Sequence, residues 1–361
     1  MERVALSPQE IAKLADVGEF NRSHGRRQFA LSDRVVGEQR WAGLAMVGAT
    51  LSNLTLNKTV LDGLQLSLSK VGGVNVVAGS LAGARVEKTT FENCRFTCVS
   101  AGGAVFSECS FRRCVFIEGA IDGAQFRHCT FEECSWQSTP LSNGVLHGVV
   151  FTGSLVENSM FRRCEVTSTE FRDCQLASVV FDAIHGGKLL VSGGKLDRCG
   201  INTSSYGPVA IARAVVRQFT FESCELREAL VEACPSVHAL RFNSCTLAGA
   251  QIKDSKEVIE LFFNASIASA LAMTDNELIW PRFWESKLEQ ASIERVAFEG
   301  CDFTASTVSA LTLKGCTFTA PVALADTVFS KLKLVTPTYA ADYRGRASHV
   351  TYIESDRFKD T

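Results

Sequence analysis

Cysteine and phenylalanine are concentrated in one stretch of the sequence, residues 89–116, which reads TTFENCRFTCVSAGGAVFSECSFRRCVF. The stretch holds four cysteines and five phenylalanines. Thiolates a few residues apart are typical of zinc sites and of redox pairs, whereas evenly spaced phenylalanines are typical of packing. Whether the protein has chemistry of its own therefore depends on the register in which these cysteines lie.

Large apolar residues recur at every fifth position over most of the chain. Steps of five from Met46 to Val231 cover 38 positions, and only Ala101 and Gly186 among them are not large apolar residues. A period of five fits neither a helix, which repeats every 3.6 residues, nor a strand, which repeats every two. The period predicts a chain that turns a corner every five residues and points one large side chain inward on each side. Four sides make a coil of about twenty residues, and stacked coils would rise by ~4.8 Å each.

The cysteines follow this register. Thirteen of the fourteen occupy a small inward position of the coils: 94, 109, 114, 129, 134, 164, 174, 199, 224, 234, 245, 301 and 316. Zinc ligands cluster locally, whereas free cysteine packs well as a small buried side chain. The six histidines share no ligand spacing, so we expect no metal site, no cofactor and no catalytic residue. Cys98 alone leaves the register, and we expect it to be an exposed thiol.

Units such as SECSF-RRCVF and RHCTF-EECSW, within residues 107–136, resemble the repeats of the pentapeptide-repeat family. In that family each unit has a small residue, a polar residue, a central Leu or Phe and two variable residues. The resemblance implies an all-β solenoid, a right-handed quadrilateral parallel β-helix. The family is functionally diverse. Its long bacterial members include secretion-system effectors and accessory proteins of the type VI spike, and other members are DNA-mimicking inhibitors or protectors of type II topoisomerases such as gyrase.

The pattern divides the chain into five segments. They are an N-terminal cap with a helix (1–40), a first array of coils (41–252), an irregular or helical interruption (253–277), a second array (278–334) and a C-terminal cap or tail (335–361). Ser7 as N-cap, Pro8 at the first helical position and Glu10 at the third predict where the N-terminal helix begins. Near Pro235 the register slips by one residue.

The interruption has two interpretations. The stretch KDSKEVIELFFNASIASALAM (253–273) has apolar spacing compatible with a helix, and Asp254 with Glu257 could form a capping box. Alternatively, Phe262 and Ile267 continue the coils through it. We favour a helical interruption near residues 253–275.

Composition sets further expectations. The net charge of −2 gives no general attraction to nucleic acid or to anionic lipid. No run of eighteen apolar residues predicts a membrane span, and the N-terminus does not read as a cleavable secretory signal. Fourteen cysteines without such a signal favour the reducing cytoplasm. Export by a machine that needs no such signal stays open.

The leading hypothesis for function is a non-enzymatic scaffold that binds a protein partner. Its finer form is a secretion-system effector or accessory protein associated with the type VI spike. Candidate anchors are the aromatic residues Trp280, Trp284, Tyr339, Tyr343 and Tyr352. No small-molecule substrate and no direct nucleic-acid binding are expected, and the oligomeric state is left open. The alternative is a DNA-mimicking topoisomerase inhibitor. Mimicry needs a sustained negative surface, but residues 91–181 hold ten acidic residues against seven arginines, a difference of only −3.

Overall fold

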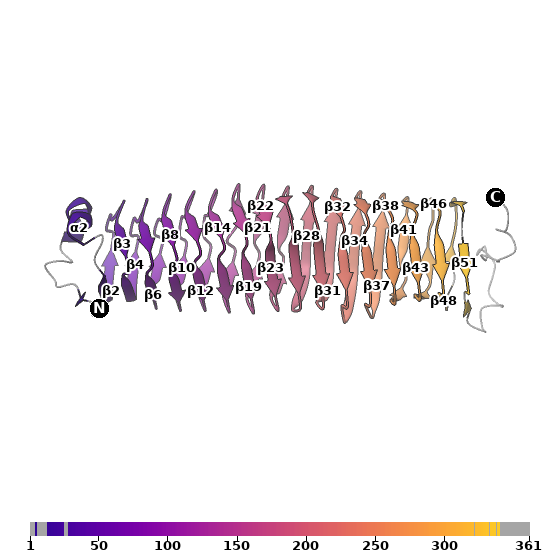
Figure 1. Ribbon diagram of the computed structural model, residues 1–361, viewed down its shortest axis with the longest axis horizontal. Helices are drawn as coiled ribbons and strands as arrows, with labels where there is room; N and C mark the ends of the chain where they lie inside the picture. Colours follow the sequence, from indigo (N-terminus) through magenta and orange to yellow (C-terminus); the bar gives the residue numbers. More distant parts are fainter. Residues whose placement is uncertain are drawn as a thin grey trace. The chain divides into compact units, whose positions relative to one another are not determined.

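The computed structural model describes residues 4–5, 13–24, 28–320, 322–331, 333–336 and 338–339. The chain divides into two compact units, Met1–Val180 and Phe181–Thr361. In each unit short strands from successive coils pair side by side in parallel, which confirms the predicted β-solenoid (Figure 1). Each complete coil has four sides, and we number these faces one to four in chain order.

Unit 1 builds its faces from the following elements. Face one holds β3 (Ala45–Val47), β5 (Gln65–Ser67), β8 (Arg85–Glu87), β11 (Val105–Ser107), β14 (Gln125–Arg127), β18 (Val145–His147) and β22 (Glu165–Thr167). Face two holds β6 (Lys70–Gly72), β9 (Thr90–Glu92), β12 (Ser110–Arg112), β15 (Thr130–Glu132), β19 (Val150–Thr152) and β23 (Thr169–Arg172). Face three holds β7 (Asn75–Val77), β10 (Arg95–Thr97), β13 (Val115–Ile117), β16 (Ser135–Gln137), β20 (Leu155–Glu157) and β24 (Gln175–Ala177). Two longer strands, β2 (Phe29–Gly37) and β4 (Thr50–Asn57), run over faces two and three, and face four holds β17 (Leu141–Ser142) and β21 (Met160–Arg162).

Unit 2 repeats this plan. Face one holds β26 (His185–Gly186), β29 (Ser205–Tyr206), β32 (Glu225–Arg227), β35 (Thr246–Ala248), β38 (Ile267–Ser269), β42 (Lys287–Glu289), β46 (Thr307–Ser309) and β50 (Val328–Ser330). Face two holds β27 (Leu189–Ser192), β30 (Val209–Ala212), β33 (Leu230–Glu232), β36 (Gln251–Lys253), β39 (Ala272–Thr274), β43 (Ser292–Glu294), β47 (Thr312–Lys314) and β51 (Lys333–Val335). The long strands β28 (Lys195–Asn202), β31 (Val215–Glu222), β34 (Ser236–Asn243) and β37 (Val258–Asn264) run over faces three and four. Later coils divide them into β40 (Glu277–Ile279), β44 (Ala297–Glu299), β48 (Thr317–Phe318) and β52 (Thr338–Tyr339) on face three, and β41 (Arg282–Trp284), β45 (Cys301–Asp302) and β49 (Val322–Ala323) on face four. Strand β25 (Val180–Asp182) begins at the last residue of unit 1.

The interior of unit 1 contains a stack of aromatic rings. Phe111 and Phe131 stack with ring centroids 4.7 Å apart, and Phe131 and Phe151 stack at 4.6 Å. Phe91 and Phe171 extend this column by one ring at either end, each at 4.7 Å. A buried Phe contributes roughly 1.5–3 kcal/mol of transfer free energy, so this column is a major source of stability.

The corners are made by residues in the left-handed backbone region. Non-glycine residues with φ near 50° recur about every fifth position, for example Asn93 (φ 53°), Cys98 (φ 53°) and Glu108 (φ 52°). This conformation is costly for residues with a Cβ. Each of these corner N–H groups donates a hydrogen bond to a carbonyl of the following coil, such as Cys98 N to Ile117 O at 2.9 Å. The pairing of neighbouring coils thus offsets the cost of the corner.

A short helix, α2 (Val17–His24), follows a 3-10 turn, η1 (Lys13–Ala15), ahead of the first coil. The side chain of Asp16 caps α2 by accepting a hydrogen bond from Glu19 N at 2.9 Å. The amide of Asn21 donates to Gly43 O and accepts from Ala45 N, both at 2.9 Å, and so pairs with the free edge of β3 as a missing strand would.

The N-terminal strand β1 (Val4–Ala5) pairs with β2, whose first residue, Phe29, lies inside the segment that we predicted as a cap. The helix start predicted at Ser7 lies outside the described residues, because the structure describes none of residues 6–12.

The helical interruption predicted near 253–275 is wrong. Residues 251–279 form β36 to β40 and continue the coils of unit 2 (Figure 1). The second interpretation, with Phe262 and Ile267 inward, is displaced by one residue: Phe263 and Ala268 are buried, whereas Ile267 is 43% exposed. The helix-like spacing arises because two successive coils each contain one additional residue.

Both additional residues lie at the corner between faces two and three. Val216 pairs with Val237 and Val237 with Val258, which makes two steps of 21 residues, and the step from Val258 to Leu278 returns to 20. The first insertion is the slip predicted near Pro235. The second lies between Ile252 and Val258.

An apolar cavity of about 90 Å³ lies inside unit 1, among residues that include Val71, Val76 and Val86. Each of these valines pairs in register with a phenylalanine of the next coil, for example Val71 with Phe91. The cavity therefore includes the coils in which smaller side chains stand in place of the rings, and it continues beside the phenylalanine columns, since Phe91 and Phe111 also line it.

Val71→Phe should extend the ring column by one member and fill part of this cavity. We expect the free energy of unfolding to rise by about 1 kcal/mol, since cavities cost about 24 cal/mol per Å³. The matched control is Val156→Phe, which adds the same volume at a fully buried position outside the cavity and should destabilise by about 1–3 kcal/mol. Chemical denaturation of the three proteins measures both effects; destabilisation by both substitutions would contradict the cavity.

A second pair of variants tests the register itself. Phe131 is fully buried between two rings, whereas the Glu132 side chain is about half exposed. Phe131→Asp should abolish cooperative folding, because it buries a carboxylate without a partner. Glu132→Lys should change the free energy of unfolding by less than about 1 kcal/mol, since it affects an exposed charge pair. Equal effects on thermal unfolding would refute the inward and outward assignment.

Candidate interaction surfaces

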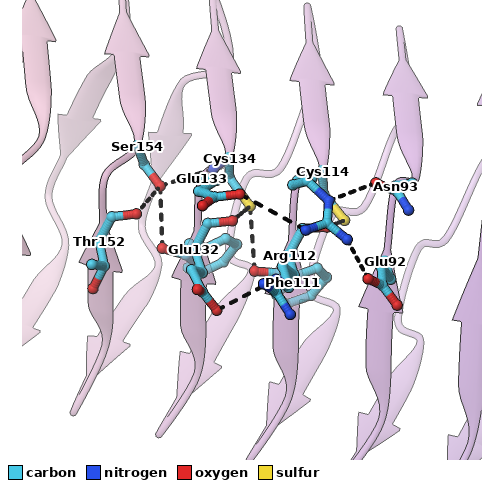
Figure 2. Close-up of polar contacts among 12 residues, drawn as sticks. Glu92, Asn93, Phe111, Arg112, Cys114, Glu132, Glu133, Cys134, Thr152 and Ser154 are labelled. Carbon is cyan, nitrogen blue, oxygen red and sulfur yellow. Dashed lines mark hydrogen bonds and ion pairs between the residues drawn. The ribbon is translucent and has the colours of Figure 1, made fainter.

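Most cysteine side chains pack in the interior of the coils. The thirteen cysteines at small inward positions are buried and free, as predicted. Several donate hydrogen bonds to carbonyls of the preceding coil, such as Cys134 Sγ to Phe111 O at 3.4 Å (Figure 2). Burial raises the pKa of the Cys174 thiol to about 11, so the reactive thiolate is disfavoured there. Among the described residues, no group of three or more His, Cys, Asp and Glu side chains could hold a metal ion.

Cys98 differs from the other thiols. It is exposed at a corner, and its Sγ donates a hydrogen bond to Glu118 Oε2 of the next coil at 3.4 Å. This hydrogen bond is the main cause that raises the pKa of Cys98 above its ordinary value. The thiol is therefore accessible but held in its less reactive, protonated form.

Glu118→Gln removes the carboxylate that disfavours the Cys98 thiolate. We expect the pKa of Cys98 to fall and its alkylation near neutral pH to become faster, since the thiolate is the nucleophile. Maleimide labelling of the native protein followed by mass spectrometry measures the rate and the modified position. Cys98→Ser is the control and should abolish fast labelling; an unchanged rate in Glu118→Gln would contradict the proposed contact.

Charges on the outside pair between neighbouring coils. Arg112 Nε lies 3.8 Å from Glu132 Oε2, and Arg113 bonds to Asn93 at 2.9 Å and also contacts Glu92 (Figure 2). In unit 2, Arg295 makes two hydrogen bonds to Asp275, at 2.6 and 2.7 Å. Exposed pairs contribute little to stability individually. They show that opposite charge in adjacent coils is the usual arrangement on this surface.

Face four of unit 2 carries an arginine–aromatic surface formed by Arg241, Phe262, Asn264, Arg282 and Trp284. The guanidinium carbon atoms of Arg241 and Arg282 each lie 5.3 Å from the centre of the Phe262 ring. The strands β34, β37 and β41 place these three residues in direct register, with Asn264 opposite Trp284. Phe262 is thus held between two guanidinium groups, an arrangement stabilised by cation–π attraction.

The two guanidinium groups have different partners. Arg241 also lies 3.6 Å from Glu260. Among the described residues, Arg282 has no carboxylate within ion-pair distance; Asp302, opposite it in register, instead accepts a hydrogen bond from Thr304 N. A guanidinium held against a ring keeps its N–H groups available for an incoming acceptor.

The predicted anchors lie at different places. Trp284 is 50% exposed on the arginine–aromatic surface, whereas Trp280 is 51% exposed at the corner between faces three and four. The Trp280 ring covers Gly300 of the next coil, where an added Cβ would come within 2.7 Å of Trp280 Cε3. Tyr339 belongs to β52, although its side chain is outside the description, and Tyr343 and Tyr352 lie outside the described residues.

Sequence reasoning missed Arg241, Phe262 and Arg282. The predicted continuation of the coils pointed Phe262 inward, because it lacked the second inserted residue. A signal was present: a step of six from Ile252 gives Val258, and steps of five then reach Leu278 without a break. That register places Phe262 outside.

Within the part of the chain that the structure describes, no helix is long and apolar enough to cross a membrane.

Comparisons with known proteins bear on the fold. Residues 104–181 match the family model described as a pentapeptide repeat region. No curated protein matches the chain. A solved structure of QnrB1, described as a plasmid-mediated fluoroquinolone resistance protein, is 15% identical, with a TM-score of 0.32, over 50% of this chain and 83% of that one.

Other solved structures match over a larger share of the chain. The Azotobacter vinelandii mannuronan C-5 epimerase AlgE6 A-module is 8% identical, with a TM-score of 0.29, over 93% of this chain and 96% of that one. PfbA, a surface adhesin of Streptococcus pneumoniae, is 9% identical, with a TM-score of 0.28, over 98% of each chain. These likenesses are too low to bear on function.

The family match and the coils reinforce each other. The matched segment contains the units with Cys, Phe and Trp, and their inward positions other than Phe116 are buried. The same four-sided coils recur in both units. Residues 104–181 are thus similar to a pentapeptide repeat region, and the coils of both units have the four-sided form that this resemblance predicted.

Proposed function

We propose that the protein is a non-enzymatic scaffold that binds a protein partner, and that the arginine–aromatic surface of unit 2 makes the contact. One observation carries the proposal. Phe262 lies on the outside of the solenoid between the guanidinium groups of Arg241 and Arg282, and the exposed Trp284 lies beside it. Arg and Trp dominate the residues that contribute most to binding at protein interfaces. A Phe turned away from the available core and held rigidly by two cations is suited to such a contact.

The chemistry of the partner follows from Arg282. Its guanidinium has no carboxylate partner in the described residues, so an acceptor such as a carboxylate or a backbone carbonyl can bind its free edge. An apolar side chain of the partner would cover Phe262 and Trp284. The many buried free thiols support a reducing, cytoplasmic compartment as the place where the partner binds.

A capture experiment tests this function. The tagged protein is incubated with lysate of its native host, and the bound proteins are compared between wild type, Phe262→Ser and Trp284→Ser. We expect one specific partner to be lost by at least tenfold in both variants, since truncation at such positions costs about 2 kcal/mol or more. Leu68→Ser, which removes another exposed apolar side chain, 61% exposed in unit 1, is the matched control.

The identity of the partner decides the finer hypotheses. A component of a secretion machine would support the secretion-associated role, whereas a type II topoisomerase subunit retained by all variants would favour the alternative of DNA mimicry. Capture that is indifferent to Phe262→Ser and Trp284→Ser would refute the proposed surface.

A further inference from the structure

The five-residue register has an exception in unit 1 that coincides with a void in its interior. Of the 38 positions in the register, only Ala101 and Gly186 are not large apolar residues. Ala101 lies on the wall of the apolar cavity of about 90 Å³ in unit 1. The residue that breaks the register therefore lies where the interior is incompletely filled.

Inward side chains around the cavity keep some accessible surface. On face one, Phe106 is 7% exposed, whereas Leu146, two coils further on, is fully buried. On face four, Leu81 is likewise 7% exposed and Leu141, three coils further on, is fully buried. All four side chains occupy the inward position of their coils, so an internal void explains the difference.

Among the described residues that line the cavity, no side chain offers a water molecule a free partner. Only Trp136 and Thr139 of the lining carry a hydrogen-bonding side chain, and both are engaged. Trp136 Nε1 donates to Thr139 O at 2.7 Å, while Thr139 Oγ1 donates to Gln137 O at 2.9 Å and accepts from Gly119 N at 3.1 Å. A buried water needs several polar partners, and an apolar cavity without them stays dry. The space is therefore suited to an apolar ligand.

The cavity is long for its volume. On face three its lining extends from Leu56 to Trp136, through Val76, Phe96 and Phe116, which spans ~19 Å at ~4.8 Å per coil. Its volume of about 90 Å³ is spread over this length and is smaller than the ~150 Å³ of an apolar cavity that accommodates benzene. A slender molecule therefore fits this space better than a compact ring does.

The backbone prevents the walls from closing around this void. Cys98 N donates to Ile117 O at 2.9 Å and Gly103 N to Asp122 O at 2.8 Å, both between coils that line the cavity. These corner bonds hold the path of each coil, whatever the size of the side chains inside it. Side chains that border a void lose dispersion contacts, and a ligand of matching shape restores them.

We propose that unit 1 binds a small unbranched aliphatic molecule in this cavity, in contact with Val71, Val76 and Ala101. Shape and dispersion alone recognise the ligand, because the lining provides no charged side chain. The ligand exchanges with solvent through local opening of the coils, a motion that folded proteins undergo continually. The site is separate from the arginine–aromatic surface and does not depend on the proposed scaffold function.

Xenon nuclear magnetic resonance of the full chain tests the site, because xenon enters empty apolar cavities. The xenon chemical shift is recorded as the xenon pressure rises, first alone and then with n-butane or benzene as competitor. Wild type should show saturable xenon binding that n-butane displaces and that benzene leaves in place, since the ring is too wide. Displacement by benzene as effective as that by n-butane, or no displacement by n-butane, would contradict the proposed ligand.

Two variants place additional atoms in the cavity. Ala101→Leu supplies the large residue that the register lacks, and Val71→Phe adds a ring to the column of Phe91. Each should raise the dissociation constant of xenon by about tenfold or more, because the side chain occupies the space of the ligand.

Ala120→Leu is the matched control. It makes the same change at an exposed position of the same face, so it should bind xenon as wild type does. Far-ultraviolet circular dichroism of every variant checks that the coils are intact. A wild-type protein without saturable xenon binding overturns the proposal, and so does wild-type affinity in either cavity-filling variant that folds.

Discussion

The fold of each unit depends on the hydrogen bond between a corner residue and the next coil. Glu108 N donates to Arg127 O at 2.8 Å and His128 N to His147 O at 2.7 Å, and both corner residues hold φ near 52–53°. Without a neighbouring coil, this conformation would cost free energy and the N–H group would lose its protein partner. A single coil is therefore unstable alone, and stability grows by stacking. Because the corners recur every five residues, the same bond also fixes which side chains point inward.

Once the corners are fixed, the interior has two positions per side with different requirements. The central position takes a large side chain such as Phe131, and the position near the corner takes a small one such as Cys129 or Cys134. Cysteine meets the second requirement because its thiol donates to a nearby carbonyl while its body packs as an apolar group. The cysteine-rich stretch is consequently explained by packing in detail. The one thiol that lies outside, Cys98, occupies a corner.

The fold could be predicted from sequence because its repeat is local and regular. The five-residue register predicted the positions of the buried rings and of the thirteen buried thiols, and it also showed the slip near Pro235. The second insertion was not recognised in the sequence. The stretch around Asp254–Glu257 also fits the start of a helix, and the apolar residues Val258, Leu261 and Phe262 have helical spacing. A shift of one residue reverses inside and outside in a strand. Because of this single ambiguity, the outward position of Phe262 and hence the arginine–aromatic surface were not predicted, although Trp280 and Trp284 were named as candidate anchors.

The same regularity indicates where function must lie. All coils share one backbone path, so surfaces differ only through their outward side chains and through inserted residues. Adjacent coils are ~4.8 Å apart, close enough for opposite charges to pair, and pairs such as Arg295 with Asp275 do so. Arg282 departs from this rule, because among the described residues it has no carboxylate within ion-pair distance, and an incoming acceptor can bind its guanidinium group. It lies in unit 2, next to the coils with additional residues. Since an inserted residue changes which side chains face outward without disturbing the stack, insertion offers a solenoid a means of acquiring a binding surface at little cost to its core.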